Sequence, residues 1–132
     1  MKLELMEEVR GGLPKGFVPY TLYSMIVNGE EVGRLTLRHG SDDECYYDGH
    51  IGYTVFEEYR GHHYSYEGCL LLKKIVDCDH LIVTCDPQNS ASQKIIQRLG
   101  CDYIETRTIP KNMKNFFARD EFEKEIYIWK IR

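Results

Sequence analysis

An anion-binding turn is predicted for the stretch Tyr59–Ser65. This stretch follows a run of β-forming residues and precedes a run with helical spacing, which indicates a strand that leads into a helix. The first backbone N–H groups of a helix have no acceptor within it, and with the helix dipole they favour phosphate. Arg60 adds a permanent charge that can bind two phosphate oxygens. An ordinary turn is the alternative interpretation.

Asn89 and Ser92 form a second polar group, at the start of a further predicted helix. The turn Asp86–Asn89 separates this helix from a short apolar run. Asn89 has a side chain that is preferred at a helix N-cap, and Ser92 could bond to the nearby backbone. Either residue could also contact a ligand. No P-loop and no G-x-G-x-x-G pattern accompanies these turns, so neither nucleoside triphosphate hydrolysis nor dinucleotide binding is indicated.

Metal binding and thiol chemistry are less well supported. His62 and His63 are adjacent, so their side chains point apart in an extended chain, and no H-E-x-x-H pattern is present. The cysteines form no C-x-x-C pair, and four of them are expected to be buried as small hydrophobic side chains. Cys85 lies next to the polar turn, so covalent catalysis by its thiol is a conceivable alternative. These four are Cys69, Cys78, Cys85 and Cys101.

The composition is that of one globular domain, spanning residues 1–132. The formal net charge of −4 argues against a nucleic-acid partner held by electrostatic attraction. No apolar run approaches the roughly 18 residues of a membrane span, and the first residues lack a secretory pattern. The expected setting is therefore the cytoplasm, without a membrane partner.

The hydrophobic pattern predicts the elements that position the two polar turns. Asn28-Gly29 predicts a tight hairpin turn between two of the strands. The segment Arg10–Pro19 has too many Gly and Pro residues for a helix, and Pro110–Phe122 is expected to be a loop or short helix. The predicted strands are Lys2–Val9, Tyr20–Val27, Glu31–Arg38, His50–Phe56, Leu81–Cys85, Tyr103–Ile109 and Glu125–Ile131, and the predicted helices are Ser65–Cys78 and Ser90–Leu99.

The two turns in this order resemble the GNAT N-acetyltransferases. The family's acetyl-CoA signature, Q/R-x-x-G-x-G/A, is similar to the stretch Val55–Ser65. Its second motif is similar to Asp86–Ser92 followed by Arg98–Cys101, and the N-x-x-S form is most similar to the branch that acetylates ribosomal-protein N-termini. Each motif is weak alone, but the pair at this separation is fairly specific.

The resemblance implies an α/β (α+β) fold with a mixed, mostly antiparallel central sheet and flanking helices. The strands that match His50–Phe56 and Leu81–Asp86 would run parallel and splay apart at their C-terminal ends. The helical region that the family places after its first strand is reduced here to Arg10–Pro19, so the acceptor cleft should be open, or closed by another subunit or by Lys111–Glu123.

The resemblance also implies acetyl-CoA as cosubstrate, and no metal. Its pantetheine arm would pair with the backbone of the first splayed strand, and its pyrophosphate would bind the turn that follows. Asn89 would bond the arm, and Ser92 would lie near the sulfur. The implied cofactor-binding residues are Tyr53, Thr54, Val55, Arg60, Gly61, His62, His63, Tyr64, Ser65, Asn89 and Ser92.

His50 and Ser92 are the implied catalytic residues. In several family members a Glu at the position of His50 activates the amine through water, and an imidazole titrates in a suitable range. Asp48 and Glu105 are lesser candidates for this base, and a plain polar residue on a strand is the alternative for His50. Many members have a tyrosine at the position of Ile96 that protonates the leaving thiolate, so Ser92 or a water would replace it.

Two functions follow from the resemblance. The first is acetyl transfer from acetyl-CoA to a primary amine by direct attack in a ternary complex. The second is a CoA-binding or interaction module that has lost transfer, because His63 replaces the glycine of the signature, Ile96 replaces the tyrosine, and the helices after the first strand are missing. A homodimer is a further possibility, based on the aromatic last strand. The acidic loop Asp42–Glu44 could attract a cationic amine, although acidic surface clusters usually serve solubility.

Overall fold

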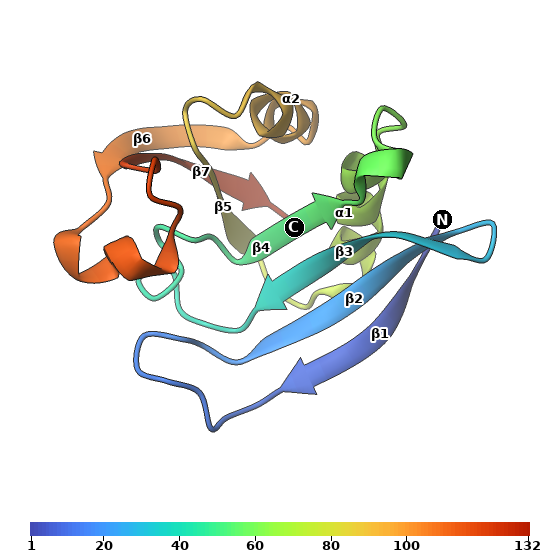
Figure 1. Cartoon of the computed structure of the whole chain (residues 1–132), viewed down its shortest axis with the longest axis horizontal. Helices are drawn as coiled ribbons and strands as arrows, with labels where there is room; N and C mark the ends of the chain where they lie inside the picture. The colour runs from blue at the N-terminus through green and yellow to red at the C-terminus, as the bar shows by residue number, and fades with distance from the viewer.

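The computed structural model describes all residues 1–132 and contains two antiparallel sheets with two α-helices (Figure 1). The predicted strands and helices are all present, with ends that shift by one to three residues. The elements are β1 (Lys2–Val9), β2 (Tyr20–Val27), β3 (Glu30–Arg38), β4 (Ile51–Val55), η1 (Glu57–Tyr59), α1 (Tyr64–Ile75), β5 (His80–Cys85), α2 (Ser90–Arg98), β6 (Asp102–Thr108), η2 (Lys111–Phe116) and β7 (Glu123–Lys130).

The sheets meet where β4 and β5 begin. One sheet has the order β1-β2-β3-β4 and the other the order β5-β7-β6. The His50 N–H donates to the Ile82 carbonyl at 2.8 Å, and beyond this point the two strands diverge (Figure 1). The α+β class and the splayed strands are as predicted. No parallel ladder forms, however, because the splay separates the strands before a second pair of hydrogen bonds can form.

The predicted hairpin joins β2 and β3. Asn28 and Gly29 both have positive φ, at 53° and 79°, as the turn between twisted antiparallel strands requires. Gly33 on β3 is needed for a different reason, since a Cβ there would lie 2.3 Å from the Thr54 carbonyl oxygen. Glycine at position 33 therefore lets β3 pair closely with β4.

Helix α1 covers the four-stranded sheet, against β1, β3 and β4. Its buried face consists of Ser65, Gly68, Cys69 and Leu72. The helix ends at Ile75, three residues before the predicted end at Cys78, because Val76 takes an extended conformation. Ile75 is 53% exposed, whereas Leu72 is fully buried. The other buried positions of the helix hold small residues, which let it pack closely on the sheet.

The remaining core lies between the two sheets and α2. Trp129 and Ile126 of β7 are almost fully buried, as is Ile96 of α2, so the aromatic last strand is mainly a core strand. The segment Arg10–Pro19 forms no helix, as predicted, and its Phe17 packs edge-on against Phe116 of η2 at 4.8 Å between ring centroids. Neither α-helix has the length and apolar character that a membrane span requires.

Candidate functional site

A cradle of backbone N–H groups precedes α1. The turn after η1 places Gly61 and His63 at positive φ, 90° and 61°. The Glu67 N–H donates to the His63 carbonyl at 3.1 Å, whereas the N–H groups from Gly61 to Tyr66 have no acceptor. Because these groups converge at the positive end of the helix dipole, the cradle can bind an anion.

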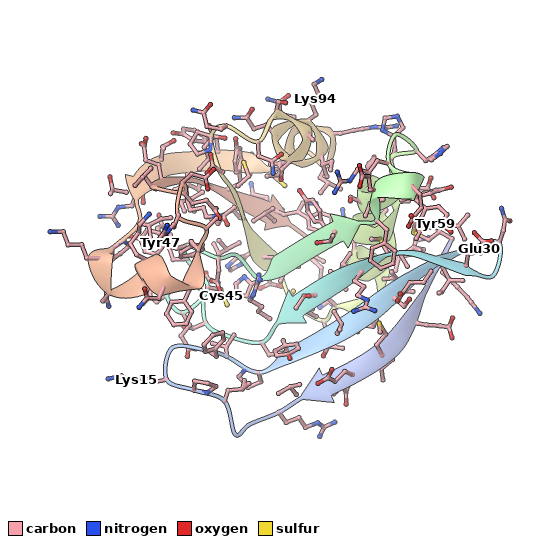
Figure 2. All side chains as sticks on the ribbon, viewed as in Figure 1. Lys15, Glu30, Cys45, Tyr47, Tyr59 and Lys94 are labelled. Carbon is pink, nitrogen blue, oxygen red and sulfur yellow. The ribbon has the colours of Figure 1, made fainter.

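Tyr59 anchors this turn to the sheet. Its hydroxyl donates to Glu30 on β3 at 2.8 Å, and Figure 2 labels both residues at one edge of the molecule. This bond links η1 to the β2–β3 hairpin, far away in sequence. The cradle therefore keeps its position relative to the end of β4.

Positive side chains surround the cradle. A groove of about 750 Å³ is lined by Arg60 and, from α2, by Lys94 and Arg98, with no Asp or Glu in its wall (Figure 2 labels Lys94). The Arg98 guanidinium lies 4.2 Å from the ring centroid of Tyr66, which holds it over α1. Sequence reasoning missed Lys94 and Arg98, because two basic residues one helical turn apart also occur on any solvated helix face. The groove is suited to a ligand with several phosphates.

The free edge of β4 forms one wall of the groove. The Phe56 N–H donates to the Val32 carbonyl at 2.9 Å, so alternate residues of β4 direct their backbone groups toward β3. Thr54 is one of these, and its backbone is not available to a ligand, contrary to the prediction. Tyr53 and Val55 direct theirs into the gap between β4 and β5, where the Val55 carbonyl accepts a hydrogen bond from the Arg60 Nε at 3.3 Å. An extended ligand can therefore pair with β4 at these two residues.

A pair of hydroxyl groups joins β4 to α2. The Tyr53 Oη and the Ser92 Oγ lie 2.6 Å apart, and Ser92 is 7% exposed. Asn89 caps α2, since its Oδ1 accepts from the Ser92 N–H at 3.1 Å. Burial raises the pKa of Tyr53, so its hydroxyl stays protonated at neutral pH. Sequence reasoning considered only the backbone of Tyr53, and periodicity gives no signal that its side chain reaches α2.

A second cavity lies on the other side of this pair. It measures about 450 Å³, and its wall includes Tyr53, Asn89 and Ser92, which also line the groove. We call it the transfer cavity. The rest of its wall comes from β4, from the end of β5 and from the segment Ala118–Lys124. The hydroxyl pair therefore stands between two spaces.

Asp48 is one of the acidic residues in the wall of the transfer cavity. Its Oδ2 lies 3.5 Å from the Arg38 Nε, whereas its Oδ1 is covered and has no hydrogen-bond partner. Burial raises the pKa of Asp48, and the charge of Arg38 opposes this shift. The structure thus places Asp48, one of the two lesser candidates for the base, in the wall of the transfer cavity. The other, Glu105, accepts a hydrogen bond from Tyr46 and lines none of the cavities described here.

The comparisons with known proteins agree with this geometry. Residues 9–102 match the family model described as "Acetyltransferase (GNAT) domain". This chain belongs to the GNAT acetyltransferase family. Among curated proteins, none matches the sequence.

Solved structures share the GNAT fold with this chain. The apo form of RimL, a ribosomal L7/L12 α-N-protein acetyltransferase, matches with a TM-score of 0.65 and 18% identity, over 85% of this chain and 70% of that one. An acetyltransferase that modifies the N-terminal serine of L7/L12 from Salmonella typhimurium matches with a TM-score of 0.66 and 16% identity, over 86% of this chain and 64% of that one. The microcin C7 self-immunity acetyltransferase MccE, in complex with acetyl-CoA and AMP, matches with a TM-score of 0.66 and 12% identity, over 84% of this chain and 61% of that one. This chain therefore spans less than two thirds of the length of the latter two proteins.

His50 lies outside the site of this GNAT domain, which corrects its prediction as the base. It is 5% exposed and lines a cavity on the other side of the sheet. Its Nδ1 accepts from the Ile82 N–H at 2.8 Å, so its Nε2 carries the proton and donates to the Gly40 carbonyl at 2.9 Å. With both nitrogens engaged, His50 holds β4, β5 and the loop before β4 together.

The other polar candidates of this GNAT domain have local partners. The Cys85 thiol lies 3.4 Å from a Glu125 oxygen, and burial with that carboxylate raises its pKa to about 12, which disfavours a thiolate nucleophile. The His62 ring stacks on Tyr64 at 5.2 Å. His80 bonds Asp42 at 2.7 Å. No three potential metal-binding side chains converge anywhere in the chain.

Proposed function

We propose that this chain transfers the acetyl group of acetyl-CoA to a primary amine. The observation that carries the proposal is the Tyr53–Ser92 hydroxyl pair, which lies between the positively charged groove and the transfer cavity. A ligand that extends from the groove along β4 would present its far end to these hydroxyls. An amine in the transfer cavity would approach the same point from the other side.

The residues of the groove fit the parts of acetyl-CoA. The N–H groups from Gly61 to Tyr66 and the charge of Arg60 would hold the pyrophosphate. Lys94 and Arg98 would bind further phosphate oxygens. The backbone of Tyr53 and Val55 would pair with the amide groups of the pantetheine arm. His63 leaves the groove open, so the departure from the family's glycine does not by itself close the site.

Bound acetyl-CoA supplies the thioester that the amine attacks. A C–N bond forms at the acetyl carbon and the C–S bond breaks. The ammonium loses one proton to Asp48 through water, and this proton reaches the solvent. The Ser92 hydroxyl donates its proton to the leaving sulfur, and the Tyr53 hydroxyl replaces that proton on Ser92. The second proton of the nitrogen passes through water to Tyr53, so both hydroxyls end as they began. The raised pKa of Asp48 brings this base closer to neutral pH than an ordinary aspartate.

Thermal unfolding with and without acetyl-CoA tests the binding half of the proposal. A ligand present at a hundred times its Kd stabilises the folded state by about 2.7 kcal/mol, which gives a clear shift of Tm. The shift should shrink in Arg60→Ala. It should persist in Arg107→Ala, a matched control on β6 whose side chain is 54% exposed.

Release of CoA over a panel of amines tests the transfer half. A rate that depends on both acetyl-CoA and an amine is the expected result. The absence of any Tm shift would contradict acetyl-CoA binding. A Tm shift without CoA release from any amine would replace the enzyme with a CoA-binding module.

A further inference from the structure

A third cavity adjoins the transfer cavity. It measures about 530 Å³ and lies between the loop before β2 and the η2 segment. Asp48 and Lys124 stand in the walls of both cavities. We call it the aromatic cavity, because Phe17, Tyr20, Phe116 and Phe117 make up most of its apolar wall, with Val18, Leu22 and Met113.

Two segments that are distant in sequence build the aromatic cavity. Phe17 and Phe116 meet edge-on, and a Cβ at Gly16 would lie 2.7 Å from the end of the Phe116 ring. Lys124 lies 4.9 Å from the ring centroid of Phe117 and pairs with Glu121 at 2.6 Å. The contacts of Phe116 hold the η2 segment against the loop before β2, and the contacts of Lys124 hold Phe117 and Glu121 within their own segment.

The charges of the two cavities differ. The wall of the transfer cavity has four carboxylates against one lysine: Asp48, Asp86, Asp120 and Glu121 against Lys124. Asp86 and Asp120 have no cationic partner. The wall of the aromatic cavity has equal numbers of each sign, Glu44 and Asp48 against Arg38 and Lys124. A cation is therefore favoured in the transfer cavity, whereas a second cation gains nothing in the aromatic cavity.

We infer that the acceptor is a primary amine on a short chain that carries an aromatic or bulky apolar group. This inference rests on the proposed function. The ammonium lies in the transfer cavity near Asp48, and the apolar group fills the aromatic cavity. Removal of a phenyl-sized group from water is favourable, so an acceptor that fills the aromatic cavity binds more tightly than one that leaves it empty. A polyamine carries cations along its length, so it does not match the aromatic cavity, where a second cation gains nothing.

Kinetics with three amines test the inference. Phenethylamine, n-butylamine and 1,4-diaminobutane present an aromatic amine, a shorter apolar amine and a dication. At saturating acetyl-CoA, kcat/KM for phenethylamine should exceed those for the other two at least tenfold, mainly through KM. Calorimetric titration of the same amines into CoA-loaded protein should give the same order, and this measurement does not depend on turnover.

Two phenylalanines of one segment give a matched pair of variants. Phe117→Ala should reduce the preference for phenethylamine over n-butylamine to less than threefold, with little change for n-butylamine. Phe122→Ala should retain the preference, since Phe122 is 61% exposed and lines neither cavity. Circular dichroism and thermal unfolding check that both variants are folded.

The outcomes separate the two proposals. Equal kcat/KM values, or a preference for 1,4-diaminobutane, would overturn the inference and leave acetyl transfer intact. A preference for phenethylamine that survives Phe117→Ala would overturn the assignment of the aromatic cavity. No acetyl-CoA binding in thermal unfolding would remove the proposed function, and the inference with it.

Discussion

The groove and the transfer cavity share the Tyr53–Ser92 pair but are built in different ways. The groove consists mainly of two short stretches, the turn before α1 and the first two turns of α2. The transfer cavity combines the loop before β4, the end of β5 and the segment before β7, which the topology brings together. The groove is therefore a local structure that uses backbone N–H groups, whereas the cavity is a tertiary structure that uses side chains.

This difference predicts where a single substitution has most effect. In the groove, several N–H groups and three basic residues share the ligand, so each contributes modestly. At the hydroxyl pair and in the transfer cavity, single side chains have single tasks. The following predictions use this contrast, from the largest expected effect to the smallest.

Ser92→Ala should have the largest effect on activity. It removes the hydroxyl that would donate to sulfur, and loss of a positioned proton donor costs about a hundredfold or more in kcat. Tyr53→Phe should cost about tenfold, because Ser92 remains. Steady-state kinetics measure both. Ser41→Ala, at an exposed position that lines none of the cavities described here, should leave kcat unchanged. A wild-type kcat in Ser92→Ala would remove Ser92 from the transfer step.

His50→Ala should affect stability and not the pH dependence of activity. The substitution leaves the buried Ile82 N–H and Gly40 carbonyl without partners, which costs about 3 kcal/mol of unfolding free energy. Urea unfolding measures this loss. His39→Ala should cost less, because His39 is exposed and has one hydrogen bond, to Thr21. A normal unfolding free energy with a changed pH profile would restore His50 as the base.

Asp48→Asn should lower kcat/KM about tenfold at alkaline pH, because the amide cannot accept a proton. The pKa of Asp48 is raised, so the wild-type carboxylate becomes protonated as pH falls through a value above the usual aspartate range. The ratio of wild-type to variant kcat/KM should therefore approach one on the acidic side. A ratio that stays constant with pH would show that the charge of Asp48 takes no part in the reaction.

His63→Gly should stabilise the fold by about 1 kcal/mol, because His63 has φ of 61° and glycine takes this conformation without strain. Acetyl-CoA affinity should change less than threefold, since the backbone N–H groups remain. His62→Gly is the matched control and should destabilise the fold, because it removes the stacking on Tyr64. A tenfold loss of affinity in His63→Gly would show that the imidazole itself contacts phosphate.

Cys85→Ser should have the smallest effect, with kcat within about threefold. At pH 8 a thiol with a pKa of about 12 is almost entirely protonated, so iodoacetamide should label Cys85 slowly in the native protein. Intact-mass measurement should show all five cysteines labelled after denaturation. Rapid labelling of Cys85 in the native state, together with loss of kcat, would revive covalent catalysis.

The sequence predicted features that depend on neighbouring residues and missed those that depend on residues far apart in the chain. The turn before α1, the α2 cap at Asn89 and the Asn28-Gly29 hairpin were all predicted, because each depends on neighbouring residues. The predicted end of α1 at Cys78 lay three residues too far along the chain, and the close contact of Gly68 with Met25 of β2 was not predicted, since it joins two distant elements. The role of the Tyr53 side chain was missed for a similar reason: its partner is 39 residues away.

By itself, the sequence determined the order of elements, the absence of a helix in Arg10–Pro19 and the position of the turn before α1, because hydrophobic periodicity, turn residues and helix termini act over a few residues. The α+β class followed from the family resemblance. Only the tertiary structure decided which polar side chains meet. It gave both nitrogens of His50 hydrogen-bond partners inside the fold and brought the hydroxyls of Tyr53 and Ser92 together. It also placed Asp48 in the walls of both the transfer cavity and the aromatic cavity. These are contacts between distant segments, fixed by how the sheets splay and how the loops pack, and no local pattern encodes them.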